Sequence, residues 1–184
     1  MRLVGIALAN NQVVRRYMNN DNWIPCYLGL GSNLTNELGS PIEHLQQAFA
    51  SLKQHKAILE LQISSCYGSA PMGPQDQPDF INAVVGFKTN LPPFQLLALC
   101  QQLEMQAQRE RLRRWGERSL DVDILLYGQQ QIDESTLTVP HIGLTERNFV
   151  LVPLRELAPE LMINGQLISH YKQSENWTGL EVIN

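Results

Sequence analysis

The order of strand-like and helix-like segments constrains the fold of this chain more than any other feature of its sequence. Apolar residues recur at helical spacing in two segments and have strand-like patterns in four: helices at 41–54 and 92–111, and strands at 23–30, 58–67, 80–89 and 119–127. The order β-α-β-β-α-β is typical of the split-βαβ arrangement. We therefore predict an α+β, ferredoxin-like fold, in which a four-stranded antiparallel sheet carries both helices on one face and leaves the other face for ligands.

The 184 residues are sufficient for a single domain with a substantial core. We assign residues 21–184 to that domain, with a C-terminal extension that contains a short hairpin at 130–139 and a helix at 145–157. Residues 1–20 precede the first strand, and we expect them to be a poorly ordered N-terminal extension. Two alternatives for this segment stay open: a mis-assigned start, with Met18 as the initiator, and a minimal secretory signal.

The charge of the chain is unevenly distributed. Its formal net charge is 14 − 18 = −4, whereas residues 109–118 contain five of the ten arginines and contribute 5 − 2 = +3. This asymmetry disfavours a general nucleic-acid surface and favours a local pocket for a polyanion. No apolar run approaches the ~20 residues that cross a bilayer. Cys26, Cys66 and Cys100 are widely spaced, as is typical of reduced thiols, so we expect a cytoplasmic protein. From the charge distribution and the short apolar runs, we expect no nucleic-acid or membrane partner.

Asp121 and Asp123 stand at the start of a continuous apolar run. Two carboxylates that are two residues apart on a strand project to the same face, and buried acids are costly unless a cation or hydrogen bonds compensate them. Divalent cations compensate them well, so the pair predicts a magnesium site. The alternative is two exposed acids that arise by chance, because a lone Asp-x-Asp is a weak signal.

The arginine-rich segment 109–118 favours a phosphate site, because guanidinium groups bind phosphate oxygens in pairs. A solvent-exposed face with internal ion pairs is the alternative. Trp115-Gly116 interrupts the segment where a helix would otherwise continue, which predicts a cationic loop at the edge of the sheet. A hard-cation site beside such a loop indicates phosphoryl or pyrophosphoryl transfer. The Gly- and Pro-rich segment 68–78 is a second candidate binding loop.

Five motifs occur in the order that characterises one enzyme family. They are Gly29-Leu-Gly-Ser-Asn33, GPQDQPDFIN at 73–82, RSLDVDI at 118–124, Val139-Pro-His141 and RNFVLVPL at 147–154. Over residues 26–162 the chain resembles the 6-hydroxymethyl-7,8-dihydropterin pyrophosphokinases, whose fold is ferredoxin-like. These enzymes transfer the terminal pyrophosphate of ATP to the hydroxymethyl group of the pterin and release AMP, in folate biosynthesis. The resemblance therefore implies ATP and the dihydropterin as substrates and two Mg²⁺ ions as cofactors.

The same resemblance implies roles for single residues. Asp121 and Asp123 would hold the two metal ions, and Arg109 and Arg118 would bind the β- and γ-phosphates and stabilise charge during transfer. The other ATP contacts would come from Gln101, Glu104, Arg111, Trp115, Ile124, Thr138, His141 and Arg147. Among these, Trp115 would be a lid residue and Glu104 would hold a ribose hydroxyl. The pterin would be bound by two stacking rings and a polar edge: Phe80, Phe149, Ser69, Asn82 and the backbone of Ala70 and Met72.

Four departures from the family pattern bear on activity. The 109–118 loop is one residue shorter than the family version, Thr136 and Ile142 replace an arginine and a tyrosine or proline, and Phe80 replaces a frequent tyrosine. We expect an active, monomeric enzyme. Three alternatives stay open: a divergent paralogue of low activity, a nucleotidyltransferase that releases pyrophosphate, and a non-catalytic ferredoxin-like module that binds RNA or a small metabolite.

Overall fold

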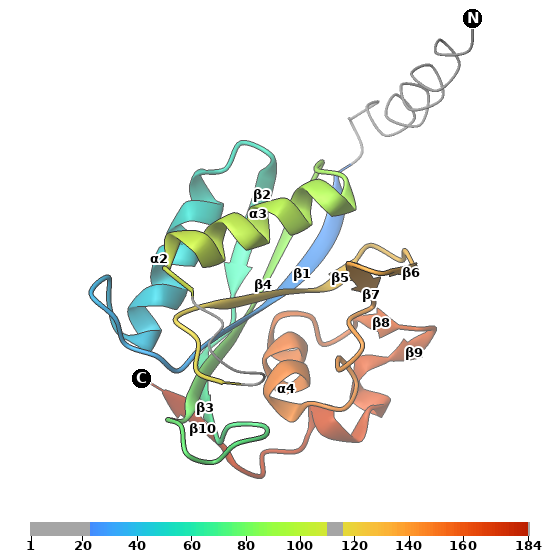
Figure 1. Ribbon diagram of the computed structural model, residues 1–184. Coiled ribbons are helices and arrows are strands. Elements are labelled where there is room, and N and C mark those ends of the chain that lie inside the picture. Colours follow the sequence, from blue (N-terminus) through green and yellow to red (C-terminus); the bar gives the residue numbers. More distant parts are fainter. Residues whose placement is uncertain (1–22, 110–115, 184) are drawn as a thin grey trace, which may run out of the picture.

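The computed structural model describes residues 23–109 and 116–183 and has an α+β architecture (Figure 1). The main sheet has six strands in the order β10-β3-β4-β1-β5, with β2 also paired to β4, and neighbouring strands run antiparallel. Its strands are β1 (Ile24–Ser32), β2 (Ile58–Ile63), β3 (Cys66–Ser69), β4 (Phe80–Thr89), β5 (Asp121–Tyr127) and β10 (Leu180–Ile183). The predicted α+β class is confirmed.

The predicted count of four strands is wrong for two reasons. The segment expected as one strand is divided into β2 and β3, which lie end to end along the same edge of β4. The division falls at Ser64, whose side-chain hydroxyl accepts the Val84 N–H at 3.0 Å in place of a backbone carbonyl. In addition, β10 pairs with β3 and extends the sheet.

Two helices, α2 (Pro41–Gln54) and α3 (Pro93–Gln106), cover one face of the sheet. Helix α2 begins after Ser40, where the Glu43 carboxylate accepts the Ser40 N–H at 2.7 Å. The apolar side chains of both helices pack on alternate residues of β1, β4 and β5. This core includes Leu28, Leu30, Leu45, Leu52, Val85, Phe87, Leu96, Cys100, Leu103, Val122 and Ile124.

Helix α3 ends at Gln106, earlier than the predicted end at 111. Gln108 has a φ of 54°, in the left-handed region, and the Arg109 N–H returns to the Glu104 carbonyl at 3.0 Å. These two features terminate the helix in the manner of a Schellman motif. The chain therefore leaves the helix axis at Arg109, and the side chain of this arginine reaches β5.

The opposite face of the sheet carries small and polar residues where three strands meet. Neighbouring residues such as Leu30, Ala83 and Val122 face the helices, and side chains alternate along a strand. The opposite face therefore presents Gly29, Gly31, Asn82, Asp121 and Asp123.

This opposite face is not free of helices, contrary to the prediction. Helix α4 (Asn148–Leu157) packs on part of it, where Leu151 and Leu154 join Val84 and Leu125 in a second apolar cluster. The helix begins three residues later than predicted, after Arg147. The uncovered remainder of this face lies at the N-terminal end of α4.

The chain after β5 begins with the predicted hairpin, formed by β6 (Ile132–Glu134) and β7 (Leu137–Val139). After α4 the chain forms β8 (Met162–Ile163), β9 (Gln166–Leu167) and the short 3₁₀ turns η1 (Ile168–His170) and η2 (Lys172–Ser174), and then reaches β10. No helix in residues 23–109 and 116–183 has the length and apolar character needed to span a membrane. The predicted N-terminal extension, residues 1–20, lies outside the described residues.

Candidate active site

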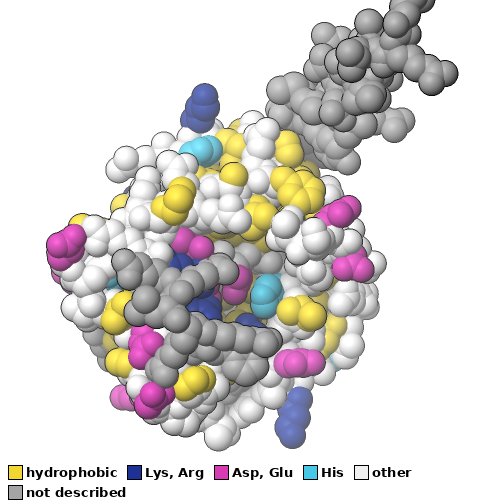
Figure 2. Space-filling model, in the orientation of Figure 1, with side chains coloured by type: hydrophobic (Ala, Val, Ile, Leu, Met, Phe, Trp, Pro, Cys, Tyr) yellow, Lys and Arg dark blue, Asp and Glu magenta, His cyan; other side chains and the backbone are white. Residues whose placement is uncertain are grey.

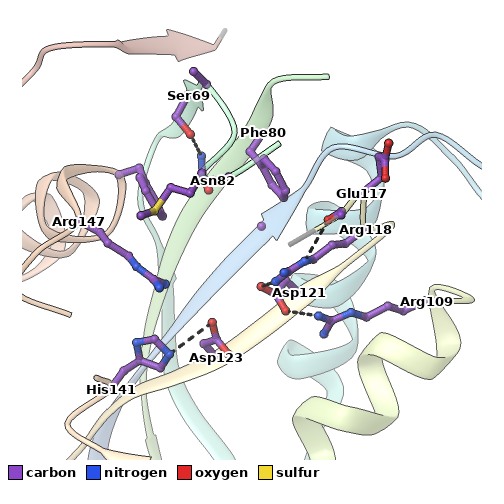
Figure 3. A pocket seen from close by; sticks show the side chains of 16 residues that line it. Ser69, Phe80, Asn82, Arg109, Glu117, Arg118, Asp121, Asp123, His141 and Arg147 are labelled. Atoms are coloured by element: carbon purple, nitrogen blue, oxygen red, sulfur yellow. Dashed lines mark hydrogen bonds and ion pairs between the residues drawn. The ribbon is translucent and has the colours of Figure 1, made fainter. Parts of the chain in front are cut away.

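A cavity of about 520 Å³ opens on the face of the sheet that carries the glycines and aspartates. Its lining comes from β1, β4 and β5, from loop residues 70–73, from segment 116–118 and from the start of α4 (Figure 3). Figure 2 shows acidic, basic and histidine side chains gathered around this hollow. The cavity is therefore the place where parts of both predicted binding loops meet the Asp-x-Asp strand.

One end of the cavity contains a closely paired group of acidic and basic side chains. Arg109 Nη2 lies 2.7 Å from Asp121 Oδ1, and Arg118 Nη1 binds the other carboxylate oxygen of Asp121. The side chains of Arg109 and Asp121 are only 8% and 19% exposed, so water screens this ion pair weakly. Both oxygens of Asp121 are thus engaged by guanidinium groups.

Glu104 supports this group from helix α3. Its carboxylate binds Arg109 Nη1 and accepts the Val122 N–H at 3.0 Å. Burial raises the pKa of the Glu104 carboxyl, and the hydrogen bond from Val122 and the charge of Arg109 partly oppose this shift. Because its carboxylate is directed at Arg109 and the β5 backbone, Glu104 fixes the orientation of this arginine.

Asp123 follows on the same face of β5, and its Oδ2 lies 3.7 Å from His141 Nε2. Burial within the cavity, followed by repulsion from Asp121, raises the pKa of the Asp123 carboxyl. In the described part of the chain, no three acidic, histidine or cysteine side chains are grouped so as to enclose a metal ion. Two carboxylates on one side nevertheless fit Mg²⁺, which is usually held by one or two carboxylates together with substrate phosphates and water.

The other end of the cavity is lined by aromatic rings and polar edges. Phe80 comes from β4 and Phe149 from the first turn of α4. Asn82 Nδ2 donates hydrogen bonds to Ser69 Oγ at 2.9 Å and to the Tyr67 carbonyl at 3.2 Å. This combination suits a flat heterocycle with donors and acceptors on its rim.

Two glycines keep space open for these side chains. At Gly31, an added Cβ would lie 3.6 Å from Asn82 Oδ1 and 3.9 Å from the Phe80 ring, at the floor of the cavity. At Gly143, an added Cβ would lie 2.5 Å from Arg147 Nε, so any side chain there would displace this arginine. Figure 3 shows the Arg147 guanidinium directed toward the side of the cavity that contains His141 and Asp123.

Known proteins share both the sequence and the architecture around this cavity. Residues 27–159 match the family described as 7,8-dihydro-6-hydroxymethylpterin-pyrophosphokinase (HPPK). The chain belongs to the HPPK family. A relative from Haemophilus influenzae, named 2-amino-4-hydroxy-6-hydroxymethyldihydropteridine pyrophosphokinase, is 46% identical over 79% of this chain and 89% of its own length. A relative of the same name from Pseudomonas aeruginosa is 43% identical over 74% of this chain and 82% of its own length.

Solved structures agree on the fold. Wild-type HPPK-DHPS from Plasmodium falciparum superimposes with a TM-score of 0.61 at 14% identity, covering 83% of this chain. The match covers 41% of that longer chain, so this chain corresponds to less than half of it. The likeness shows a shared HPPK-like fold, and the family resemblance predicted from the sequence is confirmed.

Most residues predicted for an HPPK site are brought together in the structure. Twelve of them line the cavity: Ser69, Ala70, Met72, Phe80, Asn82, Arg109, Arg118, Asp121, Asp123, His141, Arg147 and Phe149. Arg111 and Trp115 lie outside the described residues, and their roles stay predictions.

Four other predicted residues are not part of the cavity lining. Gln101 is exposed on α3 and Thr138 is exposed on β7. Ile124 is 4% exposed and packs between the sheet and the helices, so only its backbone could face a ligand. Glu104 contacts Arg109 and Val122, as described above.

Asn33 lies behind the cavity lining, and the sequence alone assigned it no role. It is 2% exposed, and its Nδ2 donates to Gln77 Oε1 at 3.1 Å and to the Pro78 carbonyl at 2.9 Å. Its Oδ1 accepts the Arg118 N–H at 2.9 Å. Asn33 therefore joins the two candidate binding loops, and its place at the end of the motif Gly29-Leu-Gly-Ser-Asn33 was the available signal. The unpredicted lining residues are Gly31, Gly73, Gly116 and Glu117.

Proposed function

We propose that this chain uses the cavity to transfer pyrophosphate from ATP to the hydroxymethyl group of 6-hydroxymethyl-7,8-dihydropterin, with release of AMP, as a step of folate biosynthesis. One observation carries the proposal. Carboxylates and arginines suited to a polyphosphate, and aromatic rings with amide edges suited to a pterin, open into the same cavity. Two substrates bound at its two ends have their reacting groups side by side, which removes much of the entropic barrier to transfer.

The reaction is a displacement at the β-phosphorus of ATP. The hydroxymethyl oxygen forms a bond to this phosphorus, and the bond to the oxygen that bridges the α- and β-phosphates breaks. The bridging oxygen leaves with AMP, and the hydroxyl proton is lost from the attacking oxygen. Because positioning and charge neutralisation dominate such transfers, alignment of the two substrates is the main task of the protein.

Arg109 and Arg118 bind the β- and γ-phosphates in this proposal. Asp121 already holds both guanidinium groups at the same end of the cavity, so they are oriented before ATP arrives. Asp121 and Asp123 would hold the two Mg²⁺ ions, which would supply neutralisation of the triphosphate charge and Lewis-acid polarisation of its oxygens.

The remaining substrate contacts are proposed from the lining and from the family resemblance. His141 and Arg147 bind ATP from the wall opposite segment 116–118, and the pterin stacks on Phe80 and Phe149. Asn82, Ser69 and the backbone of Ala70 and Met72 bind the edge of the pterin. Further ATP contacts come from Gln101, Glu104, Arg111, Trp115, Thr138 and the backbone of Ile124.

The same proposal includes the finer fold and the cellular setting. We assign the central sheet as ferredoxin-like, because its central strands lie in the order β2-β4-β1-β5. This is the strand order of a split βαβ pattern. The cysteines are free, and Cys26 and Cys100 are buried, which supports a reducing, cytoplasmic location. We propose a monomer as the working unit.

Product analysis tests this function. Purified protein is incubated with ATP, Mg²⁺ and 6-hydroxymethyl-7,8-dihydropterin, and nucleotides and pterins are separated by chromatography. We expect AMP and pyrophosphorylated pterin in equal amounts, and loss of both products in EDTA. Release of free pyrophosphate together with a nucleotidylated pterin would instead show a nucleotidyltransferase, and ATP binding without any product would show a divergent paralogue.

A further inference from the structure

After α4, the C-terminal part of the chain packs against two elements that carry cavity residues. Residues 176–183, here called the C-terminal strap, include β10 and lie beyond the residues that match the HPPK family, 27–159. Figure 1 shows β10 beside β3, at the edge of the sheet. The strap lies next to two elements that carry cavity residues, α4 and β3.

The first anchor of the strap is Asn148, in the first turn of α4. Its Nδ2 donates hydrogen bonds to the carbonyls of Asn176 at 3.0 Å and Thr178 at 2.9 Å. Its Oδ1 accepts the Phe149 N–H at 2.9 Å. Asn148 stands between the cavity residues Arg147 and Phe149, so one side-chain amide ties this turn of α4 to the strap.

The second anchor joins the strap to β3. Strand β10 pairs Leu180 with Ser69 and Val182 with Tyr67, and the Trp177 ring centroid lies 5.7 Å from that of Tyr67 at an interplanar angle of 53°. On its other side, β3 is held by Asn82, which donates to the Tyr67 carbonyl and to Ser69 Oγ. Strand β3, which carries Ser69, is therefore held on one edge by β10 and on the other by Asn82 of β4.

A third contact joins α4 directly to β3, so that α4, the strap and β3 are each bonded to the other two. Glu156, in the last turn of α4, accepts the Tyr67 hydroxyl at 2.6 Å and the Ser65 N–H at 2.9 Å. By contrast, Arg109 and Arg118 are held by Glu104 and Asp121, on α3 and β5. The strap thus supports the elements of the aromatic end of the cavity, while α3 and β5 support the phosphate end.

We propose that Asn148 and the C-terminal strap are positioning elements for the pterin: they fix the separation between Phe149 on α4 and Ser69 on β3. This inference rests on the proposed function, because it takes the pterin as the ligand between these two residues. A binding site that is already rigid loses less conformational entropy when its ligand binds, so elements that keep the site rigid raise its affinity. Loosening the strap therefore weakens binding of the pterin and leaves binding of ATP unchanged.

Asn148→Asp tests this role with little change in shape. The variant keeps the oxygen that accepts the Phe149 N–H, and a carboxylate is favourable in the first turn of a helix. It loses both hydrogen bonds to the strap and places a negative charge against two carbonyls. Trp177→Ala, which releases the contact with Tyr67, is a second variant that acts at the other anchor. Asn164→Asp, in the exposed β8–β9 turn, is the matched control with the same change of charge.

The measurement is calorimetric titration of each full-length protein with Mg²⁺ and α,β-methylene-ATP, and then with 6-hydroxymethyl-7,8-dihydropterin. In both strap variants we expect the pterin Kd to rise about threefold to thirtyfold and the Kd of the ATP analogue to stay within about twofold, while Asn164→Asp matches the wild type. Hydrogen exchange should become faster at residues 66–69 in the variants.

Two results would overturn the inference: an unchanged pterin Kd in both strap variants, or equal increases in the Kd of both ligands. Failure of the proposed function appears elsewhere, as a wild type that binds both ligands but forms no AMP. A wild type that does not bind the pterin would overturn both.

Discussion

Arg109 and Asp121 form a partly buried ion pair, with 2.7 Å between Nη2 and Oδ1, and Arg118 binds the second oxygen of the same carboxylate. One acid therefore orients two guanidinium groups. Removal of one partner from such a pair leaves an uncompensated charge in a poorly screened place. This end of the cavity is thus ordered by its own charges without any bound ligand.

Asp121→Asn should show how much turnover depends on this carboxylate. The amide keeps the shape of the side chain but loses the charge that orients both arginines and holds a cation, so we expect kcat/KM to fall about a hundredfold or more. The measurement is initial-rate kinetics over a Mg²⁺ titration. Asp133→Asn, on exposed β6, is the control and should match the wild type. An unchanged kcat/KM of Asp121→Asn at every Mg²⁺ concentration would contradict the proposed role.

Phe149→Ala and Asp123→Ala should separate binding from chemistry. Loss of the Phe149 ring removes a stacking surface, so we expect the KM for the pterin to rise about tenfold to a hundredfold with a smaller change in kcat. Loss of Asp123 should chiefly lower kcat, because it removes a proposed metal ligand. Phe94→Ala, at a 51% exposed ring on α3, is the control. Equal losses of pterin affinity in both site variants, with turnover intact, would argue against this division.

The sequence predicted the elements whose signals are local. Helical periodicity located α2 and α3, and alternation placed Asp121 and Asp123 on one face of β5. The early end of α3 was not predicted, because it depends on the left-handed backbone of Gln108. Strand β10 was missed because it is four residues long and its partner, β3, lies more than a hundred residues away in the chain.

The predicted site shows a similar limit. Motif positions identified the cavity-lining side chains Arg118 and Asn82, whose residue types suit the proposed phosphate and pterin ligands. The supporting residues could not be recognised, because their function depends on which side chains approach them in three dimensions. Gly143 matters only because Arg147 packs on its Cα, and Asn33 only because two loops converge on it.

Glu104→Gln should distinguish two roles for this residue. In the structure its carboxylate binds Arg109 and the Val122 N–H, which favours a role in orienting the arginine. The amide can still accept from Val122 but loses the ion pair, so we expect kcat to fall about tenfold. A ribose contact would instead appear as a preference for ATP over 2′-deoxy-ATP and 3′-deoxy-ATP that the variant loses. Kinetics with these three nucleotides decide between the roles, and Gln102→Ala, on the exposed face of α3, is the control.

His44 should make the fold less stable in mild acid. It is fully buried on α2, and among the described residues neither ring nitrogen has a hydrogen-bond partner. Burial lowers the pKa of His44, and the nearby Gly39 backbone and Glu43 charge oppose this only in part. An unfolded histidine titrates near pH 6.5. Below that pH, His44 is protonated in the unfolded chain but stays neutral in the folded chain. The free energy of unfolding therefore falls as the pH decreases toward the lowered pKa of His44.

His44→Leu removes this linkage while keeping a side chain of similar size. Between pH 7.5 and pH 5.5 we expect the wild type to lose more stability than His44→Leu, because only the wild type binds a further proton at this position when it unfolds. Urea unfolding at pH 7.5, 6.5 and 5.5 measures the difference. His170→Leu, at an exposed position, should follow the wild type. Parallel pH profiles for the wild type and His44→Leu would show that the buried imidazole gains its proton without cost, and that its pKa is not lowered by burial.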